Sequence, residues 1–151
     1  MMHLSAQAED VLEQLYDIEV EGAPGPAALP DDAVTGELMR RGLVEHRGDH
    51  LALTATGRPE AEQAARRHRL AERLLHDVVN VHGRQVDEAA CEFEHSLHRG
   101  IDEHVCTLLG HPKTCPHGRP IPPGRCCRTR KGTAGAVIVP ILLAQSIGLK
   151  T

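Results

Sequence analysis

Residues 85–109 read QVDEAACEFEHSLHRGIDEHVCTLL, and this stretch decides the fold. Apolar residues recur in it at intervals of three and four, which is typical of one amphipathic helix from about Gln85 to Leu109. The apolar positions are Val86, Ala90, Phe93, Leu97, Ile101, Val105 and Leu108. The first four offer more apolar surface than so small a unit can hide, so we expect a homodimer through the helices of residues 60–110.

A stripe of side chains able to bind metal runs beside the apolar one. Successive residues turn by about 100° around a helix axis, so these side chains share a face roughly 100° wide. They are Asp87, Cys91, Glu94, His95, His98 and Asp102. Such groups are costly near a core unless a cation neutralises them. The alternative is a solvated polar face, which we favour for His98, Asp102 and His104.

The preceding helix carries a matching pair of ligands. We expect this helix to open at Thr54 or Thr56 and to run to about Val79. His68 and Glu72 lie one turn apart on it, and this spacing lets two side chains bind one ion. The two helices together predict a metal centre.

The N-terminal part predicts a different architecture. The expected elements are a helix capped by Ser5 and ended by Gly22, a Gly/Pro-rich linker over residues 22–30, a short helix capped by Asp31 or Asp32 and closed at Gly42, and a hairpin of residues 43–47 and 50–53 around Gly48 and Asp49. Helix, short helix, hairpin and long helices is the order of a winged-helix unit followed by a helical dimerisation unit. We therefore expect a mainly α fold with a small β-hairpin.

Composition excludes several classes of protein. Hydrophobic residues make up 40% of the 151 residues, enough for a packed core, and the scarcity of aromatic side chains favours helices over a β-sandwich. No signal peptide is evident and no apolar run reaches the roughly 18 residues that span a bilayer, so we expect a soluble, cytoplasmic protein without a membrane partner. Neither a phosphate-binding glycine loop nor an activated nucleophile is evident, so we do not expect an enzyme.

Charge is distributed unevenly along the chain. Residues 1–39 contain nine acidic side chains and no Lys or Arg, whereas residues 112–136 contain six basic side chains and no Asp or Glu. The acidic segment repels phosphate backbones and argues against unaided DNA binding there. The basic segment is more typical of a solvated loop than of a nucleic-acid site.

The five cysteines are an odd number, which favours thiols or metal ligands over a disulfide framework. In the C-terminal part, the ligand types for zinc or an iron–sulfur centre occur at Cys115, His117, Cys126 and Cys127. Adjacent cysteines are poor partners for one tetrahedral ion, and the spacing fits no standard zinc pattern. A loop without metal is therefore the favoured interpretation.

Three motifs resemble the diphtheria toxin repressor family of iron- and manganese-dependent regulators. They are RHRLAERLL over residues 67–75, EAACEFEH over 88–95 and GHPKTCPHGRPIP over 110–122. The resemblance is dense from about Gly42 to Pro123 and also covers residues 8–22. It implies a shortened winged-helix-like domain over residues 1–58, a metal-binding and dimerisation domain over 59–123, and a Cys-rich basic tail over 124–151, the remnant of a C-terminal β-barrel domain.

The resemblance also implies two metal sites. The primary site would use Asp10, Cys91, Glu94 and His95, with Glu13 as a possible further ligand, and the ancillary site would use His68, Glu72 and Asp87. Iron-responsive members usually have methionine at the position of Asp10 and cysteine at that of Cys91, whereas manganese-responsive members have Asp and Glu. A thiolate favours Fe(II) or Zn(II) over Mn(II), and Asp10 adds a hard oxygen ligand. Fe(II) is the favoured ion, with Mn(II) or Zn(II) as alternatives.

The chain departs from the family between Gly22 and Gly42. The family places a scaffold helix and a recognition helix there, and this segment is about ten residues too short for both. The resemblance implies a metal-dependent transcriptional regulator that binds DNA as a homodimer. The alternative is a metal-binding dimeric or protein-interaction module of the same family that has lost sequence-specific DNA binding.

Overall fold

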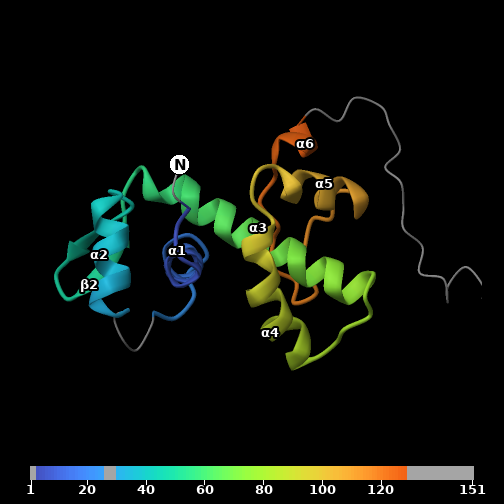
Figure 1. The fold of residues 1–151 in the computed structure, drawn as a ribbon, viewed down its shortest axis with the longest axis horizontal. Helices are drawn as coiled ribbons and strands as arrows, with labels where there is room; N and C mark the ends of the chain where they lie inside the picture. The colour runs from blue at the N-terminus through green and yellow to red at the C-terminus, as the bar shows by residue number, and fades with distance from the viewer. Residues whose placement is uncertain (1–2, 26–29, 129–151) are drawn as a thin grey trace, which may run out of the picture. The chain divides into compact units, whose positions relative to one another are not determined.

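The computed structural model describes residues 3–25 and 30–128, in two compact units, Met1–Ala65 and Arg66–Thr151. The elements are α1 (Ala6–Glu19), α2 (Asp32–Arg40), β1 (Val44–Arg47), β2 (His50–Leu53), α3 (Gly57–Asp77), α4 (Arg84–Phe93), the 3-10 turn η1 (Glu94–Ser96), α5 (Ile101–Leu108) and α6 (Arg125–Arg128) (Figure 1). The boundary between the units falls within α3. A mainly α fold with one small antiparallel hairpin confirms the predicted fold class.

The helices of the first unit begin at the predicted caps. The Ser5 hydroxyl accepts from the backbone N–H of Ala8 at 3.2 Å, and the Asp31 carboxylate accepts from that of Val34 at 2.8 Å. Each cap satisfies a donor that a helix N-terminus otherwise leaves unpaired. The predicted linker over residues 22–30 contains no helix or strand in its described part, and its residues 26–29 lie outside the described residues.

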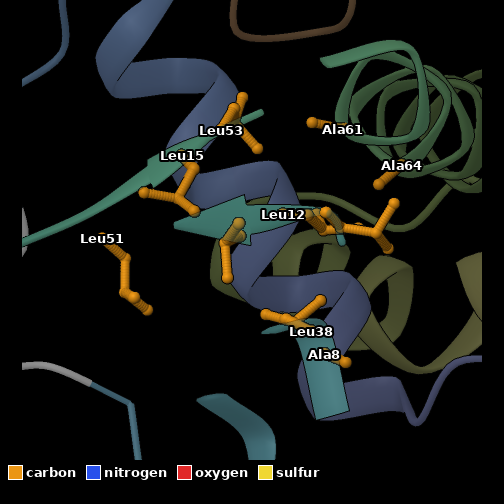
Figure 2. Close-up of a cluster of buried hydrophobic side chains, with 10 residues drawn as sticks. Ala8, Leu12, Leu15, Leu38, Leu51, Leu53, Ala61 and Ala64 are labelled. Carbon is orange, nitrogen blue, oxygen red and sulfur yellow. The ribbon is translucent and has the colours of Figure 1, made fainter. Parts of the chain in front are cut away.

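The core of the first unit is built mainly from leucine and alanine. Its buried members are Ala8, Leu12, Leu15, Leu38, Leu43, Val44, Leu51, Leu53, Ala61 and Ala64. Figure 2 shows the labelled leucines of α1, α2 and β2 grouped together, with Ala61 and Ala64 supplied by α3. The spacing of these residues in the sequence predicts the elements correctly, because each element presents one apolar face.

The start of α3 packs closely against the backbone at the start of the hairpin. The strands pair from Val44 opposite Leu53 to Arg47 opposite His50. The hydroxyl of Thr54 accepts from the backbone N–H of Gly57 at 2.9 Å, which supports the predicted helix start. A Cβ at Gly57 would lie 1.8 Å from the Leu43 carbonyl oxygen, so only glycine fits there.

The prediction of a single helix over residues 85–109 is wrong. The segment divides into α4, η1 and α5, with left-handed backbone at Arg99 (φ 58°) and Gly100 (φ 84°) between η1 and α5. Glycine adopts this conformation readily and so permits the break. The apolar periodicity did not reveal it, because Leu97 still reaches the core beyond the end of α4.

The apolar face expected to form the dimer interface is largely used inside the second unit. Val86, Ala90 and Leu97 are buried, and Phe93 alone of the four is exposed. Ala90 and Leu97 belong to a core with Leu70 and Ala71 of α3. The expectation that so small a unit cannot bury these side chains is therefore wrong for three of the four.

The second unit also buries charge. The Arg66 guanidinium, fully buried, donates to Asp102 at 2.8 Å and to the Pro122 carbonyl oxygen at 2.7 Å. A Cβ at Gly124 would lie 2.6 Å from that guanidinium, so any larger residue there would force the Arg66 side chain to move. Asp102 was expected on a solvated face, and that expectation is wrong because Asp102 lies on α5, beyond the break, facing Arg66.

Two further expectations can be compared with the structure only in part. None of the helices in residues 3–25 and 30–128 is both long and apolar enough to cross a membrane. Most of the predicted tail, residues 129–151, lies outside the described residues.

Candidate metal centre

His68 lies between two carboxylates of the second unit. Its Nδ1 is 2.5 Å from Glu94 Oε2, and its Nε2 is 3.2 Å from Glu72 Oε1. His68 and Glu72 are one turn apart on α3, as predicted, while Glu94 comes from η1, directly after α4. Both carboxylates are buried, so the imidazole supplies the hydrogen bonds that water cannot.

The chain of polar groups continues to Asp87 through His117, which the sequence pattern groups with the cysteines of the C-terminal part. His117 Nδ1 is 3.2 Å from Glu72 Oε1, and His117 Nε2 is 3.3 Å from Asp87 Oδ1. The loop that carries His117 folds back on itself, with Thr114 bridging to Pro120 and a left-handed Gly118 (φ 83°). The spacing in the sequence carries no signal for this contact, because the loop conformation creates it.

Burial and hydrogen bonding oppose each other at Glu72. Burial alone would raise the pKa of its carboxyl group, but the hydrogen bond and positive charge of His68 outweigh it, so the pKa lies below its usual value. Cys115 lies next to Glu72, and burial together with that carboxylate raises the pKa of its thiol. The carboxylate therefore stays ionised and able to bind a cation, whereas the thiol stays protonated.

The residues predicted for the primary site are placed in different ways. His95 Nε2 is 3.7 Å from Glu94 Oε1, so these two neighbours in η1 direct their polar atoms to one place. Cys91 on α4 is exposed. In the part of the chain that the structure describes, no group of three or more possible ligand atoms within 4.8 Å of one another includes Cys91.

The two remaining predicted ligands belong to the first unit. Asp10 and Glu13 lie three residues apart on α1 and are both half-buried. Residues at this spacing share one face of a helix. Their joining the ligands of the second unit stays a prediction.

The donor set of the second unit fits a divalent cation. Two buried carboxylates accompany one imidazole between them, and carboxylate oxygen with imidazole nitrogen suits Fe(II), Mn(II) and Zn(II). A hydrogen bond between His68 and Glu94 places a proton between the two groups. A cation binding here would displace that proton, so affinity would fall at low pH.

Comparison with known proteins supports this assignment of the second unit. Residues 54–123 match the family model described as iron dependent repressor, metal binding and dimerisation domain. The iron-dependent repressor IdeR of Mycobacterium tuberculosis is 35% identical over 133 residues, which cover 81% of this chain and 58% of the relative. Over residues 54–123 the chain therefore carries the metal-binding and dimerisation domain of the iron-dependent repressor family. The diphtheria toxin repressor of Corynebacterium diphtheriae, another family member, is 32% identical over 133 residues, covering 81% of this chain and 59% of that protein.

Solved structures agree on the fold of this iron-dependent repressor relative. The manganese regulator SloR matches at 24% identity with a TM-score of 0.67, and the match covers 93% of this chain and 65% of the SloR chain. A manganese-dependent transcriptional repressor in complex with manganese, at 26% identity, has a TM-score of 0.65 and covers 89% and 63%. ScaR with bound Zn²⁺, at 27% identity, has a TM-score of 0.58 and covers 77% and 59%.

The comparisons confirm the predicted family, and the winged-helix unit followed by a dimerisation unit is the fold of these neighbours. The curated relatives are named as repressors, not as enzymes, in agreement with the expected absence of catalysis. The chain spans about three fifths of the length of the curated relatives that it matches.

Proposed function

We propose that this protein is a metal-dependent transcriptional regulator that acts as a homodimer, with Fe(II) as its effector. The observation that carries the proposal is the buried Glu94 carboxylate, which lies next to His68 and His95 in a domain that matches the repressor family's metal-binding domain. A buried carboxylate–imidazole group of this kind needs a cation to be electrostatically balanced when its protons are lost.

We propose two metal sites, each with its own ligands. Asp10, Cys91, Glu94 and His95 would form the primary site, with Glu13 as a possible fifth ligand, and His68, Glu72 and Asp87 the ancillary site. The position of His117 between Glu72 and Asp87 supports adding it to the ancillary set. For Cys91 to join, its exposed side chain would have to turn toward Glu94.

The bound ion would supply a link between the two units. Asp10 and Glu13 belong to α1 of the first unit, and the other ligands belong to the second unit. A cation bound at the same time by ligands of the first unit and ligands of the second favours whichever arrangement of the units brings those ligands together. A ligand that binds one arrangement more tightly shifts the population toward it, which is what metal control of DNA affinity requires.

Fe(II) is proposed from the chemistry of the donors. A thiolate at Cys91 favours Fe(II) or Zn(II) over Mn(II), while the carboxylates and imidazoles accept all three ions. Relatives of this chain include proteins named for iron and for manganese, and one solved with zinc. If Mn(II) or Zn(II) binds more tightly than Fe(II) and activates the protein, the proposed ion is wrong but the proposed ligands still hold.

The homodimer is proposed from the family and from surface that stays exposed. The matched family model describes a dimerisation domain. Phe93, Ile101 and Leu108 of the second unit are 38%, 47% and 44% exposed. Large apolar side chains of this kind are enriched at protein interfaces.

A regulator of transcription acts where DNA is, so we place the protein in the cytoplasm.

A second candidate function is a metal-binding module that has lost sequence-specific DNA binding. In the described residues between α1 and β1 there is one helix, α2, where family members are expected to have two. The N-terminus of α2 carries Asp31 and Asp32, which oppose a phosphate. Of the nearby arginines, Arg41 donates to the His3 carbonyl oxygen at 3.3 Å and Arg47 pairs with Glu45 at 2.8 Å.

Fluorescence anisotropy with labelled DNA from upstream of the protein's own gene separates the two functions. The titration is done anaerobically with and without Fe(II), with Glu94→Gln as the variant that weakens the proposed site. A rise in DNA affinity on adding Fe(II), lost in the variant, supports the regulator. DNA affinity that does not respond to Fe(II), in a protein that binds Fe(II) by calorimetry, supports the second candidate.

A further inference from the structure

Four possible soft-metal ligands meet in the second unit, away from the carboxylate–imidazole group. They are Cys106 of α5, His111 of the following loop, and Cys126 and Cys127 of α6, and their ligand atoms all lie within 4.8 Å of one another. None of the four was predicted for the primary or ancillary site. Cys106 is fully buried and the other three are half-buried, so the group is largely closed to solvent.

The distances between these atoms match those around a tetrahedral zinc ion. Cys106 Sγ is 3.6 Å from Cys127 Sγ, and Cys126 Sγ is 3.8 Å from Cys127 Sγ. His111 Nδ1 is 3.6 Å from Cys106 Sγ and 3.7 Å from Cys127 Sγ. Zinc–sulfur bonds of about 2.3 Å and zinc–nitrogen bonds of about 2.0 Å at tetrahedral angles separate two sulfurs by about 3.8 Å and sulfur from nitrogen by about 3.5 Å.

Hydrogen bonding alone is the competing explanation. A thiol is a weak donor and a weak acceptor, so hydrogen bonds among thiols give little reason to gather four such groups. In this structure each of the four lies at a ligand-like distance from at least one other, and Cys127 from all three. A shared central ion accounts for that convergence directly.

A neighbouring cation matches the charge that the site would carry. Three thiolates and a neutral imidazole around Zn²⁺ leave one negative charge. The buried Arg66 guanidinium donates to Cys126 Sγ at 3.4 Å, while its other bonds to Asp102 and the Pro122 carbonyl oxygen fix its orientation. A buried charge needs such a partner, and a cation beside a metal thiolate also stabilises the ionised sulfur.

The adjacent cysteines are compatible with one ion because of where they lie. In the sequence, Cys126 and Cys127 are adjacent and group with Cys115 and His117 in a spacing that fits no standard zinc pattern. In the structure α6 directs both sulfurs toward Cys106, whereas Cys115 and His117 lie with Glu72. The ligands that complete the group are Cys106 and His111, which sequence spacing alone did not connect.

We infer that Cys106, His111, Cys126 and Cys127 bind a structural zinc ion. Four protein ligands of this kind leave no open position, which is typical of structural and not of catalytic or exchangeable sites. The ion would tie α5 to α6 across the loop that carries His111. Soft thiolates prefer Zn(II) to Mn(II), so this ion would stay bound when the proposed Fe(II) site is emptied.

Metal content of the purified full-length protein tests the inference. Inductively coupled plasma mass spectrometry should find about one zinc ion per chain after dialysis against a weak chelator. Cys106→Ser and Cys127→Ser should each lower this content at least several-fold. Cys115→Ser, which changes another buried thiol of the same unit, and Glu94→Ala, which disrupts the proposed Fe(II) site, should both retain the zinc. Equal zinc in the Cys106→Ser variant would overturn the inference.

Cobalt spectroscopy on the wild-type protein avoids dependence on variants that fail to fold. Co(II) added anaerobically to metal-stripped protein should give thiolate-to-cobalt charge-transfer absorption and the intense visible bands of a tetrahedral sulfur-rich site, and equimolar Zn(II) should abolish them. Absence of these bands would overturn the inference, as would a disulfide between Cys106 and Cys127 found by mass spectrometry in protein purified under anaerobic conditions. Their retention in Cys91→Ser would separate this site from the proposed primary site.

Discussion

The two units differ in what they bury. The first unit closes on leucine and alanine side chains, whereas the second encloses ionisable groups among its apolar residues. Of the buried polar residues in the described part of the chain, Glu9 alone belongs to the first unit, and the others are Arg66, Arg69, Glu72, Glu94 and Asp102. Apolar burial stabilises any well-packed arrangement, but buried charges do so only when their partners are in place. The second unit is therefore the one whose structure depends on specific pairs and, we propose, on ions.

The largest expected effect comes from breaking the buried pair of Arg66 and Asp102. Arg66→Ala leaves the Asp102 carboxylate buried without its partner, so we expect a loss of about 3–5 kcal/mol in the free energy of unfolding. Urea denaturation followed by circular dichroism measures it. The matched control is Arg47→Ala in the first unit, which removes a surface pair whose side chains are 60% and 51% exposed. Such a pair contributes at most about 1 kcal/mol. Similar losses in both variants would contradict the proposed difference between the units.

The next effect concerns metal affinity in the second unit. We expect Glu94→Ala and His95→Ala each to weaken binding of a divalent ion about ten-fold or more, because each removes a donor from the proposed primary site. His98→Ala and His104→Ala serve as controls and should leave the affinity unchanged. Anaerobic calorimetric titration with Co(II) measures it, with the zinc-loaded protein used to keep the thiol cluster occupied. An equal loss in His98→Ala would mean that another face of this segment binds the ion.

The same contrast explains which predictions succeeded. In the first unit the caps at Ser5 and Asp31 and the hairpin follow from local rules of spacing and capping, and the structure confirms them. Each rule concerns residues a few positions apart. Periodicity is sufficient where one apolar face is all that an element must provide.

In the second unit the decisive contacts join distant positions. His117 reaches Glu72 and Asp87 through a folded-back loop, and Asp102 meets Arg66 only because the helix breaks at Gly100. A helical wheel drawn through that break places Asp102 on the wrong face. The pairing of His68 with Glu72 was predictable, because it lies within one helix.

A smaller effect is expected from a carboxylate of the first unit. Glu37 accepts from the Ser5 hydroxyl at 2.6 Å and from the Ser5 backbone N–H at 2.9 Å, joining α2 to the start of α1. These two hydrogen bonds hold the pKa of Glu37 below its usual value of 4.5. A lowered pKa in the folded state means that the stabilisation is complete above the unfolded value and is lost as the pH falls through the folded value.

Glu37→Gln tests this contribution. We expect the variant to lose about 1 kcal/mol of unfolding free energy at neutral pH, and the difference from wild type to shrink in acid, as the pH falls through the lowered pKa of Glu37 and the native carboxylate is protonated. Urea denaturation at both pH values measures it. Glu45→Gln, in the exposed pair with Arg47, is the control and should change stability little at either pH. A constant difference across the pH range would argue against the carboxylate as the source.

The smallest effect is expected from the sequence of the DNA offered to the metal-loaded protein. Affinity for any DNA comes largely from neutralised phosphates, and residues 1–39 contain no Lys or Arg to neutralise them. The first unit has four arginines, Arg40, Arg41, Arg47 and Arg58, and Arg41 and Arg47 already contact the His3 carbonyl oxygen and Glu45. Specific readout needs a recognition helix held in the major groove by a scaffold helix, and the described residues between α1 and β1 supply only α2.

We therefore expect dissociation constants of about 10⁻⁴ to 10⁻⁶ M at physiological salt, and less than about ten-fold difference between upstream and scrambled duplexes. This outcome would favour the second candidate function, a metal-binding module that has lost sequence-specific DNA binding. Fluorescence anisotropy with the two duplexes, repeated at two salt concentrations, measures both quantities. A sequence-specific complex at nanomolar protein would contradict the expectation, and would mean that the segment between α1 and β1 forms a shorter but effective recognition element.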